Sequence, residues 1–309
     1  MTPPLYADAD GPADGRALWL NTQDGLRLRA AVWNADAPSG TVFLLPGRSE
    51  YVEKYGRAAG ALAMAGYSTL TVDWRGQGLS DRSCADPMLG HVGDFGEYQT
   101  DLDAMLACAV RENLPRPWYL LAHSMGGCIG LRALLRGLPF NAVAFSAPMW
   151  GIMMSDALRP VATLLASASR WLGLDQRYVP GTTQHSYLLT TPFTGNVLTT
   201  DPQMWEYMRQ HCANHVDLRM GGPSLGWLHA ALTECQTLTR LPAPVCPAIC
   251  ALGSLEKIVD TRPILAMMAR WHGARLDLYD GAEHEVLMEK PAHRDAFVHS
   301  AVTLFAAHK

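Results

Sequence analysis

Leu120-Leu121-Ala122-His123-Ser124-Met125-Gly126-Gly127 is the segment that decides the fold. An apolar run at 118–121 leads into it and predicts a buried strand, and a periodic apolar run at 128–135 leads out of it and predicts a helix. Ser124 is flanked by Ala122 two residues before it and Gly126 two residues after it. This pattern indicates a nucleophile elbow, a sharp strand-to-helix turn that holds a serine in a strained backbone conformation. Small residues are needed on both sides because the two arms nearly touch, and Ala122 is one methyl larger than the usual glycine.

Composition and charge describe an ordinary globular protein. The chain has 309 residues, of which 49% are hydrophobic and 17% charged. A chain of this length buries about 75% of its unfolded surface, so it needs neither disulfides nor a metal to fold. Its net charge of −4 argues against nucleic acid as a partner. Residues 1–15 have no basic start and no apolar core, which predicts a flexible N-terminal tail and no signal peptide.

The cysteines and the hydropathy pattern bear on location. The number of cysteines, seven, is odd, and no two of them have metal-ligand spacing. We expect all of them to be reduced and mostly buried, which favours a cytoplasmic protein. No apolar run is long enough to cross a membrane. Neither a metal nor an organic cofactor is expected.

Strand and helix patterns alternate on both sides of the serine. Apolar strand patterns at 41–45, 68–72 and 142–145 are separated by helical patterns. Such alternation predicts an α/β protein whose mostly parallel sheet is flanked by helices. Strand patterns stop at 149 and return after 242. We therefore expect a core formed by 16–148 and 243–309, with a helical cap, 149–242, inserted into it.

A serine nucleophile requires a base that takes its proton and a carboxylate that orients the base. In sheet enzymes with such an elbow, the chain order is serine, acid, histidine. Asp260 follows a predicted strand at 248–252, and His284 follows the next strand at 276–279. Both loops would leave the same sheet edge as the elbow, where ligands collect. Ser124, Asp260 and His284 are therefore the predicted catalytic residues.

Other residues fit these roles less well. His123 should point away from its neighbour Ser124, and His272 is expected to end a helix. Asp277 lies inside a strand pattern, and Asp280 is only four residues from His284. The remaining histidines are expected to be surface or core residues.

The reaction also needs two N–H donors for the oxyanion of the tetrahedral intermediate. One is predicted to be the backbone N–H of Met125. The other should come from the loop after strand 41–45, where Gly47 lets the chain turn so that the N–H of Arg48 faces the site. The alternative for this loop is an ordinary strand-to-helix turn.

Several motifs resemble the monoacylglycerol lipase and bacterial lysophospholipase branch of the α/β-hydrolase superfamily, the serine-aminopeptidase-like hydrolases. The loop Pro46 to Glu50 resembles the branch's His-Gly-x-x-Glu element, with Pro46 in place of the histidine and Glu50 retained. The loop 73–80 resembles its Asp-x-Arg-Gly-x-Gly-x-Ser element. Three segments resemble the bacterial lysophospholipase subgroup in particular: Ala-His-Ser-Met-Gly-Gly at 122–127, 89–95 and 221–227. The resemblance implies that alanine at position 122 is a feature of this subgroup and not a defect of the elbow. Gly47, Glu50, Ala122 and Gly126 would then support the elbow and the oxyanion loop.

The resemblance implies an α/β-hydrolase fold and a serine hydrolase that cleaves carboxylic esters of single-chain lipids, either lysophospholipids or monoacylglycerols. Methionine and aromatic residues of the cap would bind the acyl chain, although each could instead pack the cap against the core. Peripheral contact of the cap with the inner membrane face is also compatible with its apolar residues. One alternative is a general carboxylesterase for short acyl or aryl esters. Another is an inactive binding protein on the same fold; the oligomeric state stays open.

Overall fold

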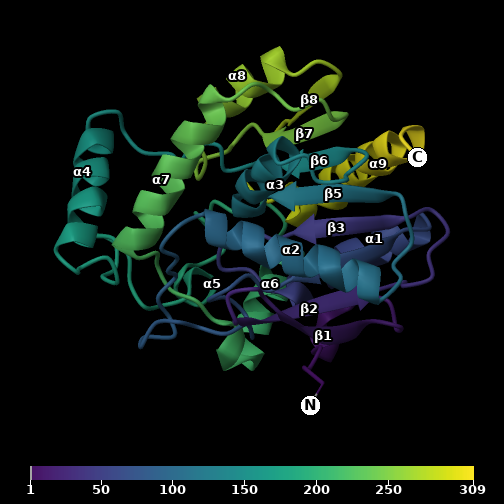
Figure 1. The fold of residues 1–309 in the computed structure, drawn as a ribbon, viewed down its shortest axis with the longest axis horizontal. Coiled ribbons are helices and arrows are strands. Elements are labelled where there is room, and N and C mark those ends of the chain that lie inside the picture. The colour runs from purple at the N-terminus through teal and green to yellow at the C-terminus, as the bar shows by residue number, and fades with distance from the viewer. Residues whose placement is uncertain (1) are drawn as a thin grey trace.

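The computed structural model describes residues 2–309, in which eight strands form one sheet. The strand order is β1-β2-β4-β3-β5-β6-β7-β8 (Figure 1). β2 is antiparallel to both β1 and β4, and the remaining neighbours are parallel. The expectation of a hairpin followed by a parallel sheet is confirmed. The strands are β1 (Arg16–Asn21), β2 (Arg27–Trp33), β3 (Thr41–Leu45), β4 (Ser68–Val72), β5 (Trp118–His123), β6 (Val143–Ser146), β7 (Ala248–Gly253) and β8 (Ala274–Tyr279).

Helices cover both faces of this sheet (Figure 1). α2, α3 and α8 contribute to the apolar cluster on one face, and α1 and α9 to the cluster on the other. The core helices are α1 (Gly56–Met64), α2 (Gly96–Arg111), α3 (Met125–Leu135), α8 (Thr261–Arg270) and α9 (Pro291–Ala307). Short 3-10 turns are η1 (Ala7–Ala9), η2 (Val52–Tyr55), η3 (Val216–Leu218) and η4 (Val286–Met288).

The central strands are apolar throughout because they are buried on both faces. In β3, Phe43 and Leu45 enter one apolar cluster, whereas Val42 and Leu44 enter the other. Successive side chains of a strand point to opposite faces, so a strand covered on both faces needs apolar residues at every position. This burial fixes the register of the strands and therefore brings the carboxyl ends of β3, β5 and β7 to one edge.

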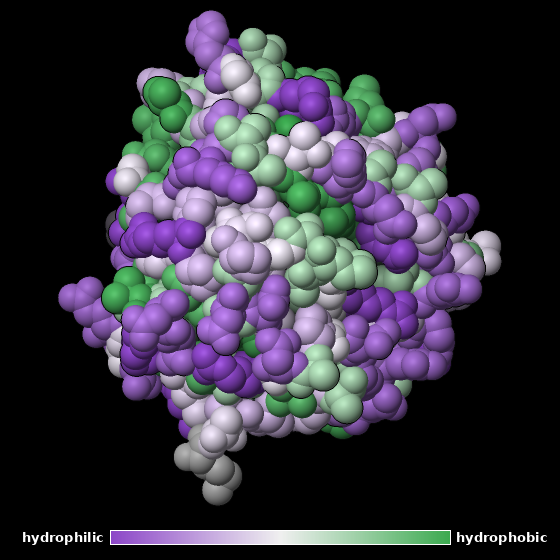
Figure 2. All heavy atoms as spheres, turned by 90° about the vertical axis from the view of Figure 1, so that its right-hand side faces the viewer, coloured by the Kyte–Doolittle hydropathy of each residue, from purple (hydrophilic) through white to green (hydrophobic). Residues whose placement is uncertain are grey.

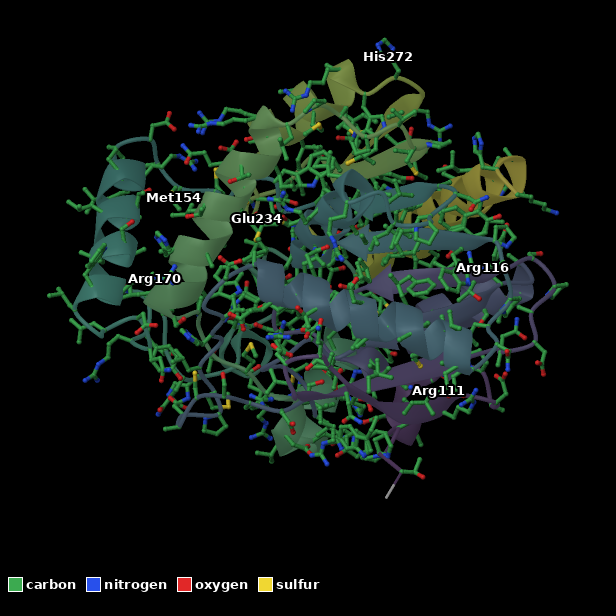
Figure 3. The ribbon with its side chains drawn as sticks, in the orientation of Figure 1. Arg111, Arg116, Met154, Arg170, Glu234 and His272 are labelled. Atoms are coloured by element: carbon green, nitrogen blue, oxygen red, sulfur yellow. The ribbon has the colours of Figure 1, made fainter. Side chains whose placement is uncertain are left out.

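Four helices lie between β6 and β7, in the range where the sequence predicts the cap. They are α4 (Leu158–Trp171), α5 (Tyr187–Thr190), α6 (Pro202–Asn214) and α7 (Leu225–Arg240). Ser224 accepts a hydrogen bond from the N–H of Trp227 and so caps the N-terminus of α7. α7 is joined to α3 by an ion pair of 2.6 Å between Arg132 and Glu234, and α4 lies outside α7 (Figures 1 and 3).

The N-terminal segment is not a loose tail in its described residues. The hydroxyl of Tyr6 donates to Asp217 at 2.9 Å, and the carbonyl of Pro4 accepts from buried Arg29 at 3.1 Å. The hydroxyl of Tyr207 donates to the carbonyl of Ala9 at 2.7 Å. The expectation of a flexible tail over 1–15 is therefore corrected for residues 2–15, because polar contacts with α6 and η3 offset the low hydrophobicity on which it rested. Met1 lies outside the described residues.

The structure bears on the expected burial of the cysteines and on the expected lack of a membrane-spanning segment. Six of the seven cysteines are buried, as predicted for packed thiols. Between Thr2 and Lys309, no helix combines the length and the apolar character required to cross a bilayer.

Candidate active site

β5 turns into α3 at Ser124 through a strained backbone. The φ and ψ angles of Ser124 are 51° and −116°, a conformation that non-glycine residues rarely adopt. A methyl group on Gly126 would lie 2.1 Å from the carbonyl oxygen of Leu45, so only glycine fits there. The methyl of Ala122 faces Gly130, where an added Cβ would lie 3.3 Å from it. A glycine one turn into α3 therefore provides the room that the elbow's Ala122 requires.

Ser124, His284 and Glu256 form one chain of hydrogen bonds. Nε2 of His284 lies 2.9 Å from Oγ of Ser124, and Nδ1 of His284 lies 2.7 Å from Oε2 of Glu256. Ser124 directly follows β5, Glu256 lies in the loop after β7, and His284 lies in the loop after β8. The structure thus brings the predicted serine and histidine together at the carboxyl edge of the sheet.

The Glu256 carboxylate is held in its ionised form. Burial alone would raise its pKa, but the hydrogen bond with His284 and those from the N–H groups of Val259 and Ile258 lower the pKa below its ordinary value. The latter two N–H groups donate to Oε1 at 3.0 and 2.6 Å, which leaves Oε2 for the imidazole. A charged acceptor on Nδ1 fixes the tautomer in which Nε2 can take a proton from serine.

The prediction of Asp260 as the acid is wrong in this geometry. Its carboxylate accepts hydrogen bonds from the side chain of Arg262 at 2.9 and 2.8 Å and from Arg159 of α4 at 3.1 Å. It also accepts from the N–H of Arg262 at 3.1 Å and so caps α8. Its oxygens are thus committed to α8 and to the cap, whereas the carboxylate beside His284 belongs to Glu256.

The sequence contains one signal that distinguishes these two acids. Asp260 immediately precedes a helical pattern with Pro263 in its first turn, which is the signature of an N-cap residue. Glu256 comes three residues after the end of β7 and has no helix to cap. Chain order alone does not separate them, because both follow the same strand.

The oxyanion loop leaves one N–H group free between two that are occupied. The N–H of Gly47 donates to Glu50, and the N–H of Ser49 donates to Gln77 at 2.5 Å. Within residues 2–309, the backbone N–H groups of Arg48 and Met125 donate to no acceptor. The pattern matches two donors reserved for a ligand atom.

The remaining histidine candidates lie as expected. His123 is buried beneath the elbow, and its Nδ1 lies 3.0 Å from the carbonyl oxygen of Ser146. Burial lowers its pKa to about 3, so its imidazole is neutral. His272 follows the end of α8, far from the sheet edge that carries Ser124 (Figure 3).

Many of the cap's aromatic and methionine residues pack into the core. Trp150 is buried against Phe145 and Trp271, and its indole N–H donates to the carbonyl of Gly127 at 3.1 Å. Met204 and Tyr207 belong to the apolar cluster under α1 and α9. Met149 lies at the nucleophile, since its N–H donates to the carbonyl of Ser124 at 2.8 Å. Core packing therefore accounts for several residues that were expected to bind an acyl chain.

Similar proteins share most of the chain. The family described as serine aminopeptidase, S33, matches residues 36–291. Lysophospholipase L2 of Escherichia coli strain K12 is 33% identical over 297 residues, covering 92% of this chain and 86% of that protein. Phospholipase YtpA of Bacillus subtilis is 26% identical over 275 residues, covering 86% of this chain and 95% of that protein.

Solved structures show the same fold. A soluble variant of monoglyceride lipase from Saccharomyces cerevisiae aligns with a TM-score of 0.73 over 100% of this chain and 96% of its own, at 19% identity. The monoacylglycerol lipase of Paleococcus ferrophilus aligns with a TM-score of 0.69 over 91% of this chain and 99% of its own, at 18% identity. The chain has the α/β-hydrolase fold, belongs to the serine aminopeptidase S33 family, in the branch that contains lysophospholipase L2, and is an ester hydrolase.

Proposed function

We propose that this protein hydrolyses the carboxylic ester of single-chain lipids through an acyl-enzyme. The observation that carries the proposal is the hydrogen-bond chain Ser124–His284–Glu256. Ser124 attacks the acyl carbonyl while His284 takes its proton. His284 then delivers that proton to the leaving alkoxide, and an activated water releases the fatty acid. Glu256 replaces Asp260 as the residue that orients the imidazole.

The oxyanion is assigned to the N–H groups of Arg48 and Met125. Arg48 follows β3 and Met125 follows β5, which are parallel neighbours in the sheet. This placement and the lack of other acceptors in residues 2–309 support the assignment. Removal of one such donor from a hydrolase typically costs about 10²–10³ in kcat. Neither role requires a metal or an organic cofactor, and the expectation of none stays a prediction.

The lipid substrate is supported by relatives. Lysophospholipase L2 of Escherichia coli covers nearly the whole chain at 33% identity. The apolar residues of the cap favour an acyl chain over a polar acyl group. Each methylene buried contributes about 0.8 kcal/mol, so long chains gain most from such a site.

A substrate panel tests this assignment. Hydrolysis of lysophosphatidylcholine, lysophosphatidylethanolamine and monoacylglycerol is measured by release of fatty acid, beside p-nitrophenyl esters of two to sixteen carbons. We expect kcat/KM to rise about tenfold or more from short to long chains because methylene burial favours them. Highest activity at two to four carbons would instead identify a general carboxylesterase.

Two matched acid variants separate the assigned roles. Glu256→Gln should lower kcat by about 10³–10⁴-fold because the amide no longer fixes the tautomer of His284. Asp260→Asn should leave kcat within about threefold and lower the free energy of unfolding by about 1–3 kcal/mol, since it weakens the α8 cap and the contact with Arg159. Steady-state kinetics and chemical denaturation check both effects. The opposite ranking of kcat would return the acid role to Asp260.

We further propose that α4 contacts the face of a lipid bilayer. Its inner side packs on α7 through small residues, Ala166 and Ser169, whereas Leu164 and Trp171 are 71% and 92% exposed. Other large apolar side chains exposed on or next to α4 are Leu158, Val161, Leu165 and Leu172. A helix in water places its apolar stripe inward, and the reverse arrangement is typical of membrane contact.

Charge and the rest of the surface support this choice of partner. Arg170 lies at the end of α4, where it can meet anionic headgroups (Figure 3). On the face of the molecule opposite α4, hydrophobic residues are scattered among hydrophilic ones (Figure 2). The free cysteines agree with the cytoplasmic, inner side of a membrane as the location.

Vesicle sedimentation tests the contact. In a Ser124→Ala background, which leaves lipids intact, Leu164→Ser with Trp171→Ser should weaken binding to phosphatidylglycerol vesicles by about tenfold or more. The control pair Val245→Ser with Leu278→Ser changes apolar residues that are also exposed but lie elsewhere. Equal loss in both pairs, or a dimer in lipid-free sedimentation that only the α4 pair dissociates, would contradict a lipid partner.

A further inference from the structure

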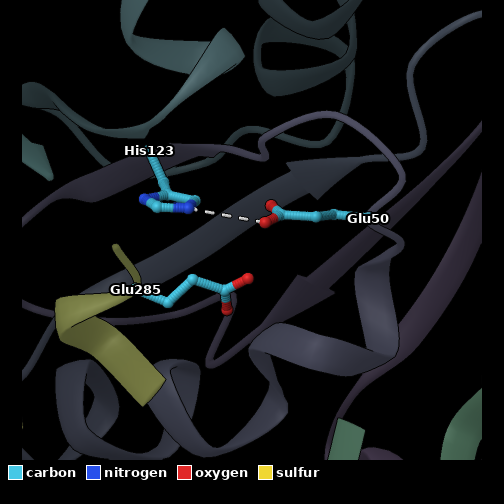
Figure 4. Close-up of side chains that lie close together, drawn as sticks. All are labelled: Glu50, His123 and Glu285. Atoms are coloured by element: carbon cyan, nitrogen blue, oxygen red, sulfur yellow. Dashed lines mark ion pairs between the residues drawn. The ribbon is translucent and has the colours of Figure 1, made fainter. Parts of the chain in front are cut away.

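A buried cluster of charged groups lies directly beneath the catalytic loops. It contains Glu50, Lys54, His123 and Glu285, and the hydroxyl of Tyr55. Figure 4 shows the two carboxylates and the imidazole converging on one point. Burying so many ionisable groups costs free energy unless each is paired. None of them is a member of the Ser124–His284–Glu256 chain.

Lys54 joins the two carboxylates. Its Nζ lies 2.7 Å from Oε1 of Glu50 and 2.5 Å from Oε2 of Glu285. Both ion pairs are between side chains at most 6% exposed, so solvent screens them little. Glu50 and Glu285 are 235 positions apart in the chain, which makes this ammonium a bridge between two distant loops.

The Glu50 end of the bridge holds the oxyanion loop. The Glu50 carboxylate accepts from the N–H of Gly47 and from the hydroxyl of Tyr55. An added Cβ on Gly47 would lie 2.9 Å from the same carboxylate. Arg48 is the next residue, so the orientation of its free N–H depends on where Glu50 is held.

The Glu285 end holds the histidine loop. Glu285 follows His284 directly, and its N–H donates to the carbonyl of Leu198 at 2.9 Å. On the other side, the ring of His123 packs at 4.8 Å from the ring of His284, and its Nε2 lies 3.5 Å from Glu50. His284 is thus joined to the cluster through its chain neighbour Glu285 and packs against a second member, His123.

The two carboxylates of the cluster differ in pKa, and the lysine between them is charged. Burial would raise the pKa of Glu50, but the charge of Lys54 and the hydrogen bonds from Lys54 and the Tyr55 hydroxyl lower it to about 2, so Glu50 is ionised. Burial and the nearby Glu50 raise the pKa of Glu285. The carboxylates raise the pKa of Lys54 against the effect of burial, so the ammonium stays charged.

We propose that Lys54 is a positioning residue that sets the distance between the oxyanion loop and the histidine loop through its two ion pairs. This rests on the proposed function, because it assigns the Arg48 N–H and His284 to one reaction. Attack on the carbonyl requires the oxyanion donor and the base to be correctly placed at the same time. A displacement of either group by about 1 Å can cost about 10²-fold in rate. Lys54 touches neither substrate nor reacting atoms.

The same cluster has the ligand types of a cation site. Glu50, His123 and Glu285 place their ligand atoms within 4.8 Å of one another. The ammonium of Lys54 already lies between the two carboxylates and supplies the positive charge. A divalent ion would have to displace it, so the cluster is better explained as a bridge than as a metal centre.

Lys54→Met tests the bridge. We expect kcat to fall about 10–100-fold with KM changed less than threefold, because the defect lies in the transition state and not in substrate binding. Affinity for an alkyl trifluoromethyl ketone, which forms a tetrahedral oxyanion on the serine, should fall by the same factor as kcat/KM. A non-hydrolysable ether lysolipid, which forms no oxyanion, should bind as it does to the unchanged protein.

Two further variants separate positioning from stability. Lys54→Met with Glu285→Gln removes one of the two buried carboxylate charges that lose their ammonium, so its Tm should recover in part while kcat stays low; it is also the test if Lys54→Met alone fails to fold. Arg29→Met removes a cation from between buried Glu53 and Asp73, contacts of 2.6 and 2.7 Å. It should lower Tm with kcat within about threefold, measured well below its Tm.

The contradicting results are distinct. Recovery of kcat together with Tm in the double variant, or an equal loss of kcat in Arg29→Met, would show that Lys54 acts through stability alone. An unchanged kcat in Lys54→Met would also overturn the bridge. A different result would overturn the proposed function itself: no reaction of the unchanged protein with a fluorophosphonate at Ser124. The variants of Lys54 test only the bridge.

Discussion

The close approach of α3 to the end of β3 is the constraint on which the site depends. The N-terminus of α3 comes so near to the carbonyl oxygen of Leu45 that position 126 must be glycine. This contact forces Ser124 into its positive φ and presents its hydroxyl at the sheet edge. The strain is offset by burial of β3 and β5 on both faces, which leaves the turn no room to relax.

The other parts of the site reach Ser124 from loops that the sheet only partly orders. β7 and β8 bring Glu256 and His284 to the correct edge, and the oxyanion loop follows β3. Their final spacing depends on polar contacts. Backbone N–H groups donate to the Glu256 carboxylate, and Lys54 forms one ion pair with the oxyanion loop and one with the histidine loop. Asp260 has a related role at the cap, since it ties α8 to Arg159 of α4.

Period and chain order were sufficient to predict the sheet, the helices between β6 and β7, and the serine and histidine that the structure brings within 2.9 Å of each other. The helices predicted at 225–238 and 291–307 match α7 and α9 within a few residues. Asp260 was predicted because Asp260 and Glu256 follow the same strand. The N-cap pattern at Asp260 and the side-chain partners in the structure, His284 for Glu256 and the Arg262 N–H for Asp260, separate the two. The N-terminal segment was missed because its order comes from hydrogen bonds to α6 and η3, residues about 200 positions away. Contacts of that range leave no local pattern in a sequence.

The central claim is that Ser124 is a nucleophile activated by His284. Intact-protein mass spectrometry after exposure to a fluorophosphonate, followed by peptide mapping, tests it most directly. A serine activated in this way should give one adduct per chain, located on Ser124, with no adduct on Ser124→Ala and a much slower reaction for His284→Ala. Equal labelling of the unchanged protein and Ser124→Ala would contradict it.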